Sequence, residues 1–239
     1  MIMNYSNLHP WKVNIQQAVR IQQKLRKKII LSDNLPKINR VAAVDVAFTD
    51  DLAICAVCIF EYPGLNLIQI SQAKRKVTFA YVPGLLTFRE GPVILQAFRR
   101  LKTKPDLVLF DGQGICHSRR MGIATHLGMV LNLPSIGCAK SHLYGVYQMP
   151  RENKGDFSYI YERNTNEVLG IALRTRRQVK PLFVSCGYKT SLTLAIRLIL
   201  KLCPKYRIPQ PLRFAHRLAS DFCSSRRIAR PIPAYQDFA

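Results

Sequence analysis

Apolar residues at helical spacing open the chain. Across residues 11–31 they recur every three or four positions, with many Gln, Lys and Arg between them. One apolar face on a polar segment predicts an amphipathic helix. A turn-rich stretch, residues 32–39, separates this helix from the first strongly apolar run.

Three apolar runs with short links follow. They cover residues 41–48, residues 52–60 and a run that ends near Phe79, with turns at 49–51 and 62–64. Successive strands joined by short turns predict an antiparallel meander.

From residue 87 helices alternate with short strands. Residues 87–101 and 121–131 have helical spacing, whereas 106–111 and 135–139 are short buried runs. Strands separated by helices are typical of parallel additions to a sheet. The predicted fold class is therefore α/β, with a mixed sheet of order β-β-β-α-β-α-β flanked by helices.

The pattern continues to the end of the chain. We expect further strands at 145–149, 157–161, 168–173 and 182–186, and helices at 190–202 and 211–222. The tail from about Cys223 is expected to be loosely ordered. Because there is no internal repeat, low-complexity segment or clear linker, residues 1–239 are predicted to form a single domain.

The chain has a large excess of basic over acidic residues. Thirty-six Lys and Arg oppose fourteen Asp and Glu, which gives a net charge of +22. Such a chain attracts polyanions by releasing their condensed counterions. The alternatives are a solubility device or a binder of acidic membranes. The membrane alternative lacks a basic amphipathic anchor with a bulky apolar face, so nucleic acid is the favoured partner.

The cellular compartment can be inferred from the absence of targeting and membrane-spanning features in the sequence. No apolar run reaches the roughly 18 residues of a membrane span, and the N-terminus has no signal-peptide core. Seven cysteines form no dense framework, which is typical of a reducing compartment. We therefore expect a soluble, cytoplasmic protein without membrane contact. Cys55 and Cys58 would point to opposite faces of a strand, which predicts core packing rather than a zinc site.

Three carboxylates stand where this sheet would gather them. Asp45 lies inside the first apolar run, and Asp111 ends the fourth, before a glycine-bearing turn. Glu90 is near the start of the intervening helix. If the first and fourth strands are neighbours, the three side chains converge. Three oxygen donors with open positions suit Mg²⁺ or Mn²⁺, and such a site activates water and stabilises the leaving 3′-oxygen of a phosphodiester.

Each carboxylate also has a structural alternative. Asp45 would form a buried salt bridge with an arginine. Glu90 ends the pattern Thr87-Phe-Arg-Glu90, in which a glutamate bonds back to the start of its helix. Asp111 would cap the following turn.

Four segments, in order, resemble the motifs of the endonuclease V family. They are VAAVDVAF at 41–48, YVPGLLTFRE at 81–90, PDLVLFDGQGICHSRRMGIATHLG at 105–128 and PSIGCAKSHLYG at 134–145. A weaker match covers 184–187. The resemblance runs from about residue 41 to 220, and its third segment is highly specific.

The resemblance implies a ribonuclease-H-like fold and a metal-dependent endonuclease. The family's metal carboxylates match Asp45, Glu90 and Asp111, with Mg²⁺ as the expected ion and Mn²⁺ as a plausible one. A residue that supports the metal site matches His216. The implied reaction nicks DNA containing deaminated bases at the second phosphodiester 3′ to hypoxanthine, which leaves 5′-phosphate ends and initiates repair.

The family's base-separating wedge matches Tyr81, Val82 and Pro83, with Gly84 after them. A rigid apolar tip can replace a stacked base and favour its extrusion. The structural alternative is an ordinary Pro-Gly turn.

The remaining candidates come from the longer motifs. His117 would contact the scissile phosphate or assist proton transfer, unless it is a structural histidine. Lys140 offers a compact positive charge to phosphate. Gly112 and Gly122 would present backbone amides to the pocket of the extruded base.

The chain departs from the family at Ser118, Cys186 and Tyr188, where proline, proline and histidine are usual. None of these positions is a metal ligand, but they leave the substrate range open. One alternative is an inosine-specific ribonuclease that uses the same site. The other is a basic nucleic-acid-binding protein without catalysis. We expect a monomer in each case.

Overall fold

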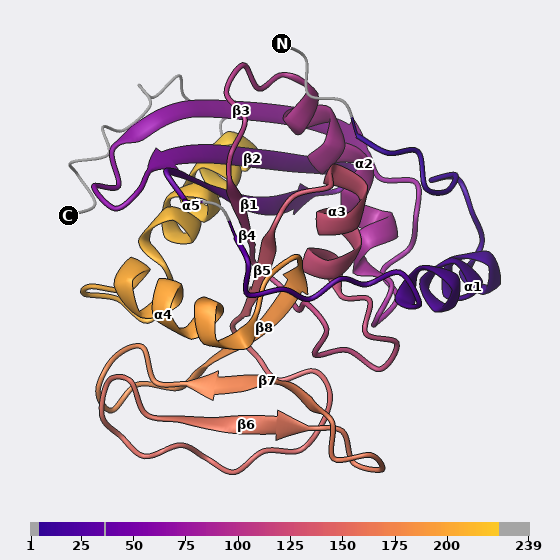
Figure 1. Ribbon diagram of the computed structural model, residues 1–239. Coiled ribbons are helices and arrows are strands. Elements are labelled where there is room, and N and C mark those ends of the chain that lie inside the picture. Colours follow the sequence, from indigo (N-terminus) through magenta and orange to yellow (C-terminus); the bar gives the residue numbers. More distant parts are fainter. Residues whose placement is uncertain (1–4, 36, 225–239) are drawn as a thin grey trace.

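The computed structural model describes residues 5–35 and 37–224, and its centre is one eight-stranded mixed sheet (Figure 1). The strand order is β3-β2-β1-β4-β5-β8-β7-β6. The strands are β1 (Arg40–Thr49), β2 (Leu52–Glu61), β3 (Leu67–Lys76), β4 (Leu107–Phe110), β5 (Ser135–Ala139), β6 (Phe157–Tyr161), β7 (Val168–Leu173) and β8 (Leu182–Tyr188). The helices are α1 (Ile15–Arg26), α2 (Leu86–Arg99), α3 (Ile123–Leu131), α4 (Leu192–Leu202) and α5 (Gln210–Ser224). The predicted α/β class and strand–helix order are confirmed.

The two sheet faces carry separate apolar cores. Residues of α2 and α3 pack on one face, and residues of α4 and α5 pack on the other. Cys55 belongs to the first core and Cys58 to the second, and both are fully buried. The prediction that this pair fills the core from opposite faces of a strand is confirmed.

The strand pairing brings two of the predicted carboxylates side by side, one in the middle of β1 and one directly after β4. β1 pairs antiparallel with β2 and parallel with β4, in a register that places Val44 opposite Phe110. The residues that follow this pair are Asp45 and Asp111. The expectation that the first and fourth strands are neighbours is therefore confirmed.

Three element predictions were less accurate. The helix predicted for 11–31 begins only at Ile15, because Asn14 and Gln17 form a reciprocal capping box there. The strand predicted for 145–149 is wrong, since this segment makes only one isolated bridge, between Val146 and Tyr161. Helix α5 continues to Ser224, and the rest of the predicted loose tail lies outside the described residues.

The described helices are too short or too polar to serve as membrane-spanning segments.

Candidate active site

A cleft of about 440 Å³ opens where β4 ends, beside the middle of β1. Its walls come from both strands, the loop before α2, the loop after β4, the end of β5 and helix α5. The structure brings every candidate residue predicted from the sequence to this cleft: Asp45, Tyr81, Val82, Pro83, Gly84, Glu90, Asp111, Gly112, His117, Gly122, Lys140 and His216.

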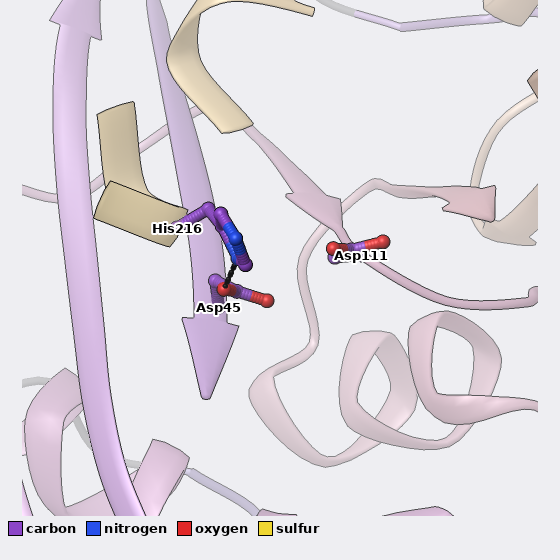
Figure 2. A group of neighbouring side chains, drawn as sticks. All are labelled: Asp45, Asp111 and His216. Atoms are coloured by element: carbon purple, nitrogen blue, oxygen red, sulfur yellow. Dashed lines mark hydrogen bonds and ion pairs between the residues drawn. The ribbon is translucent and has the colours of Figure 1, made fainter. Parts of the chain in front are cut away.

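Asp45, Asp111 and His216 form the tightest cluster in the cleft (Figure 2). One possible metal-ligating atom from each lies within 4.8 Å of the others. His216 Nδ1 donates to the Asp45 carboxylate over 2.7 Å. The predicted salt-bridge alternative for Asp45 is therefore replaced by a contact with a histidine of α5. A hydrogen-bonded histidine of this kind fixes the orientation of the carboxylate.

Lys140 closes the cluster on the side of β5. Its Nζ lies 2.5 Å from the Asp111 carboxylate, in an ion pair in which Asp111 is mostly buried and Lys140 is partly exposed. Lys140 directly follows β5, and Asp111 directly follows β4, which is parallel to β5. The ion pair thus joins the ends of two neighbouring strands.

Glu90 stands in the second turn of α2, in the wall of the same cleft. Helix α2 begins after Leu85, and no side chain caps its first turn, so the capping-box alternative is wrong. Glu90 does not belong to the cluster within 4.8 Å. It is nevertheless electrostatically linked to that cluster, because burial and the charges of Asp45 and Asp111 raise the pKa of Glu90 to about 8.

The electrostatics of the cleft fit a divalent cation. Burial, followed by the charge of Asp111, raises the pKa of Asp45 to about 6, although His216 and Lys140 act in the opposite direction. Because burial and the neighbouring carboxylates both raise these pKa values, the carboxyl groups do not readily ionise together without a counter-charge. A hard cation with oxygen ligands supplies that counter-charge, and carboxylates suit Mg²⁺ and Mn²⁺. The residues present therefore fit such an ion.

The predicted wedge forms part of the loop between β3 and α2. Tyr81 is 68% exposed and Pro83 is also exposed, so both can contact a ligand at the rim. Val82 is half-buried and packs against the cluster that contains Phe79 and Phe88. The tip is thus two exposed residues with an apolar anchor between them.

His117 is buried, and both of its ring nitrogens are engaged. Nε2 lies 3.0 Å from the Gly84 carbonyl oxygen, and Nδ1 accepts from the Arg119 backbone N–H. These partners place the proton on Nε2. Burial, and then the charge of Arg119, lowers the pKa of His117 to about 4, so the ring is neutral at pH 7. In this arrangement the histidine connects two loops.

Close packing explains the glycines of the cleft. The amides of Gly112 and Gly122 donate to the carbonyls of Phe110 and Gly114, so both are engaged within the chain. A Cβ on Gly122 would lie 2.3 Å from the Gln113 carbonyl oxygen, a distance that only glycine tolerates.

Three residues that make polar contacts at the cleft were not identified from the sequence. Gln113 is buried in its wall, where Nε2 donates to the Ser141 carbonyl and Oε1 has no hydrogen-bond partner among the described residues. Gln22 and Arg119 contact the wedge loop. A signal for Gln22 did exist, because it is a polar residue on the apolar face of α1, four positions after Ala18 and three before Leu25.

Comparisons with known proteins agree with this geometry. A sequence profile of the family Endonuclease V matches residues 23–217. Endonuclease V from Dictyoglomus turgidum is 47% identical over 216 residues, which cover 90% of this chain and 94% of that protein. The crystal structure of Endonuclease V from Bacillus subtilis has a TM-score of 0.88 and 32% identity, and the match covers 94% of this chain and 99% of that one.

A third similar protein was solved with a bound nucleic acid. Endonuclease V from Ciona intestinalis was solved in complex with a 24mer DNA containing an inosine followed by a ribo-adenosine. That structure has a TM-score of 0.78 and 29% identity, and the match covers 89% of this chain and 99% of that one. The likeness to these structures confirms the predicted ribonuclease-H-like α/β fold. By sequence and by fold, the chain belongs to the endonuclease V family of nucleases.

Proposed function

We propose that this chain is a divalent-metal-dependent endonuclease that nicks nucleic acid at the second phosphodiester 3′ to a hypoxanthine base, and so initiates repair of deaminated DNA. The observation that carries the proposal is the cluster of Asp45, Asp111 and His216, with Glu90 in the same cleft. The bound inosine-containing DNA of the Ciona intestinalis relative supports the substrate class.

The acidic residues would hold the ion. Asp45, Glu90 and Asp111 supply oxygen donors for Mg²⁺, which Mn²⁺ could replace, and His216 orients Asp45. When bound, the ion would activate water and stabilise the leaving 3′-oxygen. Lys140 supplies a fixed positive charge beside Asp111, and this charge would stabilise the phosphate as negative charge develops on it.

The remaining cleft residues would recognise the extruded base. Tyr81 and Pro83 would occupy the space that the base leaves in the stack. Gln113 lines the cleft, and its buried Oε1 is an acceptor that has no hydrogen-bond partner in the part of the chain that the structure describes. Hypoxanthine carries a hydrogen on N1, whereas adenine presents a lone pair there. A buried acceptor therefore favours the deaminated base, because adenine would leave it unsatisfied.

RNA is the second candidate substrate. The oligonucleotide bound to the Ciona intestinalis relative carries a ribonucleotide directly after the inosine, so that protein accommodates a 2′-hydroxyl close to the lesion. The non-catalytic alternative is less favoured, because a protein that only bound phosphate would gain from losing these carboxylates. One chain supplies every candidate site residue of the cleft, so the site needs no second copy, and we propose that the monomer acts.

Cleavage of matched strands tests this function. End-labelled DNA and RNA strands, each with one inosine, are incubated with the protein and Mg²⁺ beside strands with adenosine at that position. We expect one product from an inosine strand, cut at the second phosphodiester 3′ to the lesion. Equal cutting of the adenosine strands, or no cutting of either inosine strand, would contradict the proposal.

A further inference from the structure

We propose that Gln22 of α1 is a positioning residue that, together with His117 and Arg119, holds the wedge loop at the edge of the cleft. This inference rests on the wedge role in the proposed function. The three side chains are called the Gly84 clamp below, because all of them bond to the Gly84 carbonyl oxygen.

The clamp converges on one atom. Gln22 Nε2, His117 Nε2 and the Arg119 terminal nitrogen each lie 3.0 Å from the Gly84 oxygen. A carbonyl oxygen has two lone pairs, so three donors saturate it. A carbonyl bonded in this way has little freedom to rotate, and the Gly84–Leu85 peptide, one residue after Pro83, is fixed with it.

Gln22 is the member of the clamp that joins the others. Its Oε1 accepts from Arg119 Nε over 2.6 Å, and its Nε2 also donates to the Met121 carbonyl. The side chain is fully buried, although glutamine is usually exposed. Burying an amide is favourable only when its hydrogen bonds are made, and here the partners lie on two different loops. Gln22 therefore ties α1 to the wedge loop and to the loop after β4.

The wedge loop depends on this tie. The loop spans the residues between Lys76, which ends β3, and Leu86, which begins α2. Arg89 holds its first half through the Phe79 carbonyl, whereas the clamp holds its second half, directly after Pro83. Gly84 has a φ of +81°, and a Cβ there would lie 2.8 Å from the Arg119 guanidinium. The backbone is thus confined to a conformation that only glycine adopts readily.

A rigid wedge matters for one kind of substrate. Extruding a base from a duplex costs a few kcal/mol of stacking and pairing. The wedge can offset this cost only if it keeps its position while the base is displaced. In a single strand the base is already accessible, so the demand on the wedge is small. Loss of the clamp is therefore expected to harm cutting of a duplex more than cutting of a single strand.

The variant Gln22→Met tests the proposal, because methionine has a similar volume but cannot make these hydrogen bonds. We would measure kcat and KM on matched inosine-bearing duplex and single-stranded DNA. We expect kcat/KM to fall about tenfold or more on the duplex, since several buried hydrogen bonds are lost. On the single strand the change should stay within about twofold. The control is Gln23→Met, the same substitution at an exposed position of α1.

A double variant separates positioning from a general folding defect. If Gln22 acts through the wedge, adding Gln22→Met to Tyr81→Ala should cost far less on the duplex than Gln22→Met costs alone. Additive losses, equal losses on both substrates or no loss on the duplex would each overturn the proposal. Failure of the wild-type protein to cut either inosine substrate would instead contradict the proposed function.

Discussion

At the cleft, neighbouring charges set the protonation of individual side chains. Glu90 and Asp45 keep their protons to higher pH than ordinary carboxyl groups, because burial and the adjacent carboxylates disfavour their charged forms. His117 shows the opposite effect, since burial and Arg119 keep it neutral. Two acids beside the place that we assign to a cation thus have raised pKa values, whereas the histidine elsewhere in the cleft is neutral.

The pKa of Glu90 predicts how stability depends on pH. Its pKa is raised from 4.5 to about 8 in the folded chain. As pH rises above 4.5, the unfolded chain releases this proton while the folded chain retains it, so stability is lost until about pH 8. For one proton the slope is up to about 1.4 kcal/mol per pH unit. Urea unfolding of metal-free protein at a series of pH values measures it.

The matched variant for this measurement is Glu90→Gln, which keeps the shape but cannot ionise. Its unfolding free energy should decline less between pH 5 and pH 8 than that of the wild type. A wild type and a variant with the same slope would show that Glu90 does not titrate as the pKa requires.

The positive charge of Lys140 is expected to contribute to the rate of cleavage. Replacing Lys140 with alanine removes the positive charge beside Asp111, so kcat on an inosine strand should fall about a hundredfold. The variant Lys140→Arg keeps the charge and should recover part of the loss. If kcat is unchanged in Lys140→Ala, the charge does not stabilise the reaction.

Among the elements, local patterns predicted the sheet better than the helix ends. Continuous apolar runs identified β1 and β4, and on the condition that these strands are neighbours, the approach of Asp45 to Asp111 could be anticipated. The capping box of Thr87 and Glu90 was a false signal, because Thr87 lies inside α2 rather than before it. A short sequence motif does not reveal where a helix begins once tertiary packing decides it.

Contacts that are distant in sequence were harder to foresee. Asp45 and His216 are 171 positions apart, and their contact depends on how α5 packs on the sheet. The resemblance to a family, not the periodicity, brought His216 into the predicted site. Gln22 lies outside the motif segments and just before the matched family region, so only the structure revealed its contacts.

The packing of α5 leads to a prediction about the site. Phe214 is fully buried, packs edge-on against Phe60, and lies two residues before His216. The variant Phe214→Ala should lose roughly 3–5 kcal/mol of stability, because it leaves a cavity. It should also lower the activity of the folded fraction, since α5 positions His216. Chemical unfolding and cleavage rates at matched folded fraction measure both effects.

The control is Leu198→Ala, in α4 on the same apolar core. Among the described residues, α4 contributes none to the cleft, so this variant should lose stability but retain the activity of its folded fraction. If both variants lost activity equally, α5 would have no special role in placing His216.

The whole molecule has a net charge of +22, which should dominate its affinity for nucleic acid. Cations that neutralise phosphates release condensed counterions, so binding weakens steeply as salt rises. We expect affinity for an undamaged labelled strand, measured by fluorescence anisotropy, to fall on the order of a hundredfold or more between about 50 and 200 mM salt. A nearly constant affinity would mean that the surplus charge does not contact the strand.

The proposed cleavage depends on a cation shared by Asp45, Glu90 and Asp111, and calorimetric titration with Mn²⁺ tests for this ion directly. We predict that the wild type binds the ion and that Asp111→Asn weakens binding about a hundredfold or more. The control variant Glu61→Gln, at the opposite end of the β1–β2 pair, should bind like the wild type. Unchanged binding in Asp111→Asn, or no binding by the wild type, would contradict the metal site.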